Sequence, residues 1–158
     1  KLVLPKYPDW QWDLYGTGDT LDEIRKKIEE YGLEKQLILK GNVKDVYQVY
    51  GDYAFLVLPS YREGLPLVLL EAKALGLPMI SFDITTGPRE IINEGEDGYL
   101  IPPYHIEEMA AKIETLIIDE KQRILFSKNT EKGIEKFCKR RIYSEWEELI
   151  ETLCGGEE

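Results

Sequence analysis

Short apolar runs alternate with longer segments of helical spacing along the first two-thirds of the chain. The run 54–58 (AFLVL) is almost wholly apolar, which is typical of a parallel strand that helices cover on both faces. From residue 106 onward the apolar residues keep a helical period. The pattern predicts an α/β fold, a parallel sheet with helices on both faces followed by a C-terminal helical tail. The expected strands are 10–15, 36–40, 54–58, 78–82 and 99–101, and the segments expected between them are 20–31, 44–50, 66–75 and 88–93.

Length and charge limit the classes of protein to which the chain can belong. Its 158 residues, 43% of them hydrophobic, suit one compact domain spanning 1–158. With 30 acidic and 20 basic residues the net charge is −10, which argues against nucleic-acid binding. No run approaches the roughly 20 apolar residues of a membrane span. Cys138 and Cys154 form no CxxC pair and have no histidine nearby, so we expect free thiols in a reducing cytoplasm and no metal site.

The loops that follow the expected strands are the candidate site, because parallel sheets bind ligands at the carboxyl ends of their strands. Three loops qualify, 16–19, 41–45 and 59–67. The first contains a GxG pattern at Gly16 and Gly18. This pattern is shorter than a dinucleotide-binding or phosphate-loop fingerprint, and it also fits a tight turn into a helix. Thr20 and Glu23 then form a capping-box pattern at the start of the next helix.

The third loop leads into a helix with two glutamates eight positions apart, Glu63 before the helix and Glu71 inside it. Pro66 suits the first helical position, because its missing N–H costs nothing there and its fixed φ fits a helix. The free N–H groups after it would carry the partial positive charge that favours a diphosphate. Since two anions repel, Glu63 would accept hydrogen bonds from the hydroxyls of a neutral sugar beyond the phosphates.

Glu71 is expected on the same helical stripe as the apolar residues Leu67 and Leu75. A carboxylate buried there loses favourable hydration, and hydrogen bonds to a charged group return about 1.5–3 kcal/mol each. Two vicinal hydroxyls, such as those of a ribose, would about balance the loss. The alternative is that Glu71 reaches solvent at the helix edge and that the glutamate spacing is a coincidence in an acidic chain.

Other polar and aromatic residues have plainer interpretations. His105 is expected to cap a helix or to face solvent. Arg62 and Arg89 are expected on surface loops, with a phosphate or carboxylate partner as the alternative. Tyr143 and Trp146 are expected to pack rather than to form a ligand platform.

The stretch 59–74 resembles the E-x7-E signature of retaining GT-B glycosyltransferases of the glycosyl transferases group 1 superfamily, in which two Rossmann-like domains face each other across a cleft. Further segments resemble the same family in order along the chain. They are 7–18 (second strand and glycine turn), 37–43 (strand and turn at the base), 87–92 (the helix after the next strand), 95–102 (GEDGYLIP, similar to NGxLxxP) and 106–153 (the tail that crosses back to the N-terminal domain). The resemblance implies a Rossmann-like donor-binding domain that is truncated at its N-terminal side, with its first strand and most of its first helix missing.

The resemblance also implies roles for the residues that match the family's pattern. Glu63 would contact the donor sugar near the reaction centre as the catalytic residue, and Glu71 would hold the ribose. The remaining contacts would come from Gly64, Leu65, Leu67 and Val68 for the sugar and diphosphate, Asn42, Val43 and Asp45 for the base, and Gly16 and Gly18 for the glycine turn near the donor. Members of this kind use a UDP- or GDP-linked sugar, transfer it with retention of configuration and need no obligatory metal or other cofactor.

Departures from the family pattern set expectations too. The Arg and Lys that the family places near the diphosphate belong to the first strand–helix segment, which this sequence does not contain, and Pro66 stands where the family often has Gly. The acceptor site belongs to the N-terminal domain, so we expect the isolated chain to be inactive. The resemblance implies polysaccharide, glycolipid or cell-envelope synthesis, in the cytoplasm or at the inner face of the membrane through the N-terminal domain. A GT-B-fold nucleotide-sugar epimerase and a non-catalytic α/β nucleotide- or partner-binding module stay open as alternatives.

Overall fold

Five parallel strands form two separate sheets in the computed structural model, which describes residues 1–154. In the smaller sheet β1 (Trp12–Tyr15) pairs with β2 (Leu37–Gly41), and in the larger sheet the order is β3 (Leu56–Leu58), β4 (Met79–Phe82) and β5 (Gly98–Ile101). Every pair is parallel, and each strand lies within two residues of its predicted range. The α/β class and the parallel pairing are therefore confirmed, whereas the expectation of one continuous sheet is wrong.

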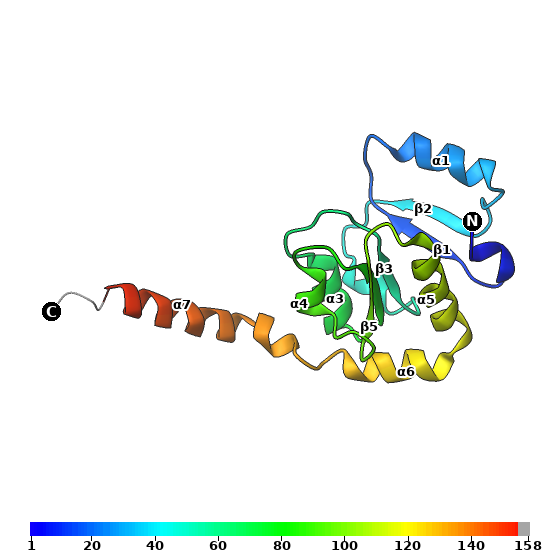
Figure 1. Cartoon of the computed structure of the whole chain (residues 1–158). Coiled ribbons are helices and arrows are strands. Elements are labelled where there is room, and N and C mark those ends of the chain that lie inside the picture. The colour runs from blue at the N-terminus through cyan, green and yellow to red at the C-terminus, as the bar shows by residue number, and fades with distance from the viewer. Residues whose placement is uncertain (155–158) are drawn as a thin grey trace.

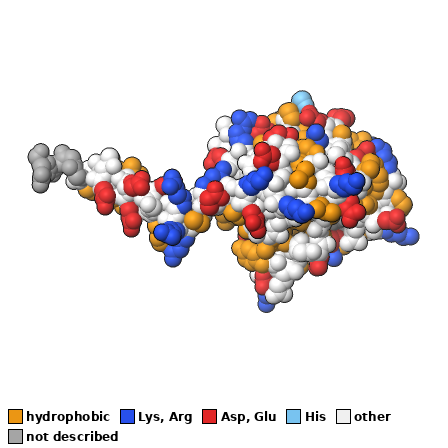
Figure 2. Space-filling model, turned by 90° about the horizontal axis from the view of Figure 1, so that it is seen from below, with side chains coloured by type: hydrophobic (Ala, Val, Ile, Leu, Met, Phe, Trp, Pro, Cys, Tyr) orange, Lys and Arg blue, Asp and Glu red, His pale blue; other side chains and the backbone are white. Residues whose placement is uncertain are grey.

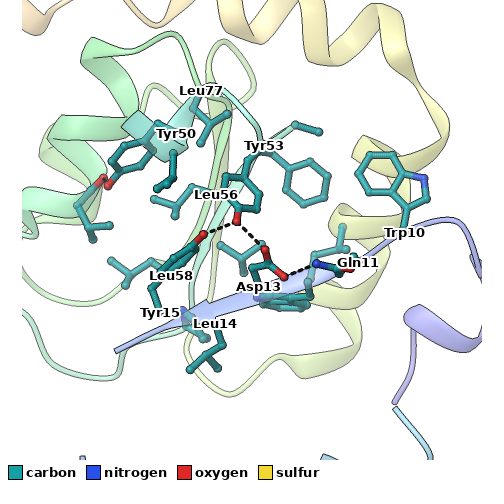
Figure 3. Close-up of a pocket in the computed structure, with 18 of the residues that line it drawn as sticks. Trp10, Gln11, Asp13, Leu14, Tyr15, Tyr50, Tyr53, Leu56, Leu58 and Leu77 are labelled. Atoms are coloured by element: carbon teal, nitrogen blue, oxygen red, sulfur yellow. Dashed lines mark hydrogen bonds between the residues drawn. The ribbon is translucent and has the colours of Figure 1, made fainter. Parts of the chain in front are cut away.

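A cavity of about 350 Å³ separates the two sheets, with β1 on one side and β3 on the other (Figure 3). Apolar side chains from both layers of helices line it, including Val49 and Val68 on one side and Ile113 and Ile117 on the other. No hydrogen-bond ladder joins β1 to β3 within residues 1–154. The edges of β1 and β3 that face the cavity therefore have no strand partner in this part of the chain.

Helices cover both faces of the larger sheet (Figure 1). Side chains alternate along a strand, so Met79 packs toward α3 (Leu67–Ala74) and α4 (Pro88–Ile91), while Ile80 packs toward α5 (Ile106–Ile118). All four residues of β4 are buried, as the apolar run 78–82 predicts for a central strand. The carboxyl ends of β3 and β4 consequently lie side by side, and the loops that leave them form one surface.

The smaller sheet carries the N-terminal elements of the chain. η1 (Leu4–Lys6) and α1 (Leu21–Glu30) pack on it through a small core formed by Leu4, Ile28 and Leu33. Thr20 stands at the N-cap of α1, but its side chain makes no capping hydrogen bond, so the predicted capping box is wrong. The backbone oxygen of Thr20 accepts the N–H of Ile24, and the N–H of Leu21 donates to the Gly18 oxygen at the start of the helix. After β2, the short helix α2 (Tyr47–Tyr50) leads toward β3.

The C-terminal tail is helical as predicted, with α6 (Glu120–Asn129), η2 (Ile134–Phe137) and α7 (Lys139–Cys154) following α5. The helix α7 extends away from the rest of the domain (Figure 1), and no residue of it is buried. Figure 2 shows basic side chains of this projecting helix toward the body and acidic ones farther out. Tyr143 and Trp146 are exposed, so within residues 1–154 the expectation that they pack against other residues is wrong.

Across the same residues, no helix combines the length and apolar character needed to cross a bilayer.

Candidate functional site

The amino end of α3 is the centre of the candidate site. Pro66 is the N-cap, with φ −73° and ψ 99°, and the helix begins at Leu67. The prediction that Pro66 is the first helical residue is therefore off by one position. A proline has no N–H to lose at either place, and its φ near −65° fits the N-cap as well as the first helical residue. The N–H groups of Leu67 and Val68 have no hydrogen-bond partner among the described residues, and the Leu67 side chain is exposed.

The loop after β4 packs against the loop that leads into this helix start. The Thr86 hydroxyl donates a 2.8 Å hydrogen bond to the backbone oxygen of Glu63. Gly87 has a φ of 96°, and a Cβ placed on it would lie 2.5 Å from the Gly64 oxygen and 2.5 Å from Pro66 Cδ. The backbone after β4 thus touches the loop after β3 at a point where only glycine fits. The sequence alone identifies 87–92 as a segment that resembles the family, but it does not predict this contact between the two loops.

Glu63 lies in the loop between β3 and α3, where its side chain is half-buried. Its carboxylate accepts no hydrogen bond from residues 1–154. A partly buried carboxylate without a donor keeps its full capacity for external hydroxyl donors. Arg62, beside it, is exposed and makes no ion pair within the same residues.

Glu71 is half-buried on α3 and already has two internal hydrogen-bond donors. Tyr50 donates to its Oε2 over 3.0 Å and Tyr47 donates to its Oε1 over 3.3 Å. Burial and the carboxylate of Glu71 raise the pKa of Tyr50, and the negative charge of Glu71 is the main cause that raises the pKa of Tyr47. Both tyrosines therefore remain protonated donors at neutral pH.

The helical stripe of Glu71 differs from the expected one. Leu67 and Leu75 are both exposed, so this side of α3 is not an apolar core stripe. The buried side carries Leu69, Ala72 and Lys73 instead. The two tyrosine hydroxyls supply part of the compensation that the sequence assigned to ribose hydroxyls alone.

The loop expected to contact a base lies directly before α2. Val43 is 39% exposed, and Asn42 and Asp45 are exposed as well. The carboxylate of Asp45 accepts a 2.8 Å hydrogen bond from Gln48 of α2. Because Tyr47 in the same helix contacts Glu71, the loop and the glutamate are physically connected.

The other residues singled out from the sequence fall into plainer roles. Gly16 has a φ of 128° and donates its N–H to the Gly41 oxygen, so a glycine is needed there, while Gly18 has open space around it. His105 is exposed at the N-cap of α5 and makes no capping hydrogen bond, although its ring lies 3.3 Å from Glu108. Arg89 pairs with Asp83, which is the carboxylate alternative considered for it.

The residues that could ligate a metal or carry a thiol are dispersed over residues 1–154. No group of three potential His, Cys, Asp or Glu ligands comes together in that part of the chain. Cys138 and Cys154 are free and exposed.

The cavity between the sheets contains a polar cluster that sequence reasoning missed. The side chain of Asp13 is 5% exposed and accepts hydrogen bonds from Tyr53 at 2.6 Å and Gln11 at 2.5 Å (Figure 3). The ammonium of Lys40 lies 3.2 Å from the same carboxylate. The hydroxyl of Tyr15 bonds that of Tyr53. The cluster satisfies its own charges and hydrogen bonds, and the rest of the cavity is lined by core-like apolar side chains, so we place the candidate site at the α3 start.

Comparison with known proteins identifies the family of the chain. Residues 1–133 match the family described as Glycosyl transferases group 1. Over 152 residues the chain is 36% identical to an exopolysaccharide phosphotransferase of Streptomyces coelicolor, covering 96% of this chain and 16% of that protein.

Solved structures agree with this assignment. A structure of a mutant of Staphylococcus aureus TarM in complex with fondaparinux, α-GlcNAc-glycerol and UDP matches 94% of this chain and 30% of that one, with TM-score 0.88 and 34% identity. The C-terminal domain of a glycosyl transferase group 1 protein (LpcC) of Francisella tularensis matches 85% of this chain and 73% of that one, with TM-score 0.74 and 33% identity. The chain therefore belongs to the glycosyl transferases group 1 family and has the fold of the C-terminal domain of a GT-B glycosyltransferase.

Proposed function

We propose that this chain is the donor-binding half of a glycosyltransferase that moves a hexose-type sugar from a UDP- or GDP-linked donor to an acceptor, with retention of configuration. The observation that carries the proposal is the start of α3. There the N–H groups of Leu67 and Val68 lack partners among the described residues and stand between Glu63 and Glu71 in the chain.

The diphosphate of the donor binds at this helix start. Unpaired N–H groups and the helix dipole together place partial positive charge there, and no acidic residue lies in the first turn of α3. When the bond between the anomeric carbon and the β-phosphate oxygen breaks, negative charge grows on the leaving diphosphate. Fixed N–H donors stabilise that charge without a metal ion.

The two glutamates bind neutral hydroxyls on either side of the diphosphate. Glu63, whose carboxylate is free of donors within residues 1–154, takes the hydroxyls of the donor sugar near the reaction centre. The N–H groups of Gly64 and Leu65 in the same exposed loop assist it. Glu71 takes the ribose, and Asn42, Val43 and Asp45 meet the base from the loop that precedes α2.

Two relatives support a proposal for the biological setting. The Streptomyces relative is named for exopolysaccharide, and the Staphylococcus structure contains UDP. This chain spans less than a third of either protein, which supports our proposal that the acceptor site belongs to a further domain of the same protein. We place the reaction in cell-envelope polysaccharide synthesis and expect this chain alone to show no turnover.

Isothermal titration of the chain with UDP, GDP and ADP tests the proposal. One of the three should bind in preference to the others, and Glu71→Gln should weaken that binding about tenfold, because a neutral amide oxygen forms a weaker hydrogen bond than a carboxylate by about 1–1.5 kcal/mol. Glu63→Gln should leave nucleotide binding within about twofold, since it contacts the sugar, and should mainly reduce kcat in a protein that carries both domains.

Glu30→Gln is the matched control, because Glu30 is an exposed glutamate at the end of α1. It should change neither binding nor turnover. Absence of binding to all three nucleotides, or equal and negligible effects of Glu63→Gln and Glu71→Gln, would remove the site from this end of α3.

A further inference from the structure

The two hydrogen bonds that hold Glu71 come from tyrosines in very different surroundings. Tyr50 is 5% exposed and donates to Oε2 over 3.0 Å, whereas Tyr47 is 59% exposed and donates to Oε1 over 3.3 Å. Each oxygen of the carboxylate thus has one tyrosine donor, one from the protein interior and one from the surface. Both tyrosines belong to the single turn of α2.

Breaking the hydrogen bond between Tyr50 and Glu71 would cost considerable free energy. The ring of Tyr50 packs in the core cluster with Leu69, Leu77 and Met79. Among residues 1–154, its hydroxyl has only the Glu71 carboxylate and, at 3.3 Å, the Val68 oxygen as acceptors. In Figure 3 the ring borders the cavity and the hydroxyl points away from Asp13 and Tyr53. A buried hydroxyl that loses its acceptor is strongly disfavoured, so this bond fixes the orientation of Glu71.

Tyr47 is held weakly by comparison. Its hydrogen bond to Oε1 is long and its ring is mostly exposed to water. Its hydroxyl has no other hydrogen-bond partner among the described residues. A hydroxyl that leaves a surface carboxylate regains water as its partner. A ligand can reach the half-buried Glu71 only from the solvent side, which is the side that the exposed Tyr47 occupies.

We propose that Tyr50 is a positioning residue that aims Glu71 at the ribose, and that Tyr47 is an internal competitor that the ribose hydroxyls displace from Oε1. The inference rests on the proposed role of Glu71 as the ribose ligand. It assigns opposite effects to two tyrosines on one carboxylate. Removal of the Tyr50 hydroxyl loosens Glu71 and weakens ribose binding, whereas removal of the Tyr47 hydroxyl frees Oε1 and strengthens it.

The experiment compares the dissociation constants of UDP and 2′,3′-dideoxy-UDP by isothermal titration, because only UDP offers the two hydroxyls. The wild type should bind UDP about tenfold more tightly than the dideoxy nucleotide, in line with two hydrogen bonds to a charged group that partly replace bonds to water. Tyr50→Phe should lower the affinity for UDP about fivefold and leave the dideoxy nucleotide within about twofold, so that the preference nearly disappears. Tyr47→Phe should raise the affinity for UDP about two- to fivefold and again leave the dideoxy nucleotide unchanged.

Tyr143→Phe serves as the control, since Tyr143 is exposed on α7 and should alter neither constant. A merely structural role of Tyr50 would lower the affinity for both nucleotides equally and would overturn the proposal, as would a loss of UDP affinity in Tyr47→Phe. A wild-type preference for UDP that survives Tyr50→Phe would overturn the tyrosine roles alone. Equal wild-type affinity for UDP and its dideoxy analogue would instead reject Glu71 as the ribose ligand, and this inference with it.

Discussion

Replacing Gly87 with alanine should damage the candidate site more than its small size suggests. Gly87 has φ 96° and ψ −69°, a backbone conformation that residues with a Cβ rarely adopt. The added Cβ would lie 2.5 Å from the Gly64 oxygen and 2.5 Å from Pro66 Cδ. An ordinary contact needs about 3.4 Å or more. Since both neighbours are backbone or proline ring, the loop before α3 must move by about 1 Å.

The magnitude follows from two contributions. The strained backbone costs about 1–3 kcal/mol. Overpacking at a contact that cannot yield costs about another 1–3 kcal/mol. We therefore expect Gly87→Ala to lower the free energy of unfolding by about 2–6 kcal/mol, depending on how far the loop moves to relieve the clash. Because the displaced loop carries Gly64 and leads into Leu67, UDP binding should weaken at least tenfold wherever the variant stays folded.

Urea unfolding followed by tryptophan fluorescence measures the first effect, and isothermal titration with UDP measures the second. Gly51→Ala is the control, because Gly51 has a φ of −64° and nothing lies within 4 Å of the Cβ position. It should leave stability unchanged or raise it by up to about 1 kcal/mol. If Gly87→Ala unfolds within about 0.5 kcal/mol of the wild type and binds UDP equally well, the close contact between the two loops does not exist in solution.

Two further predictions concern buried charges. Lys73→Met should cost about 3–5 kcal/mol in urea unfolding, because it strands the fully buried Asp97, whereas Lys132→Met at an exposed ion pair should cost under about 0.5 kcal/mol; similar costs would contradict this reasoning. For Asp13, burial raises the pKa, but hydrogen bonds from Tyr53 and two other side chains outweigh it and leave the pKa lowered. Its stabilisation is thus complete above the unfolded-state pKa of about 3.9 and is lost as the pH falls through the lower folded value. Asp13→Asn should flatten the acid side of the stability–pH curve, and an unchanged curve would oppose the assignment.

The sequence predicted the strands well because each strand is defined by a local pattern. The runs 54–58 and 78–82 are apolar throughout, and both lie in the larger sheet with helices on either face. Their arrangement into two sheets could not be predicted in the same way. Whether β1 pairs with β3 depends on what fills the space between them, and no periodicity along the chain reports on that space.

The site shows the same division between local and long-range information. Glu63, Glu71 and the start of α3 could be predicted as a candidate site because a proline and two acidic residues lie within a few positions of each other and resemble a family signature. Tyr47 and Tyr50 were missed because they come from a different element, more than twenty residues before Glu71, and their contacts exist only in the folded chain.

The failed capping box at Thr20 shows a limit of local patterns as well. The pattern S/T-x-x-E names residues that can form a cap, but the side-chain bond requires an extended N-cap conformation. Thr20 has φ −88° and ψ 1°, outside that region, and so its hydroxyl does not reach the helix.

An acidic chain with a net charge of −10 can still favour a nucleotide sugar, because the proposed contacts with the diphosphate and with the sugar hydroxyls differ in kind. In the proposed site the diphosphate meets neutral N–H donors at α3, while Glu63 and Glu71 would repel any bare phosphate that approaches. Those same carboxylates attract hydroxyl hydrogens, so a sugar on one side and a ribose on the other offset the repulsion. Inorganic pyrophosphate gains the N–H contacts alone and bears the full repulsion. Under the proposed function, discrimination between a complete donor and a simple anion therefore comes from the acidic residues, and substituting them with basic ones would strengthen phosphate binding while removing that discrimination.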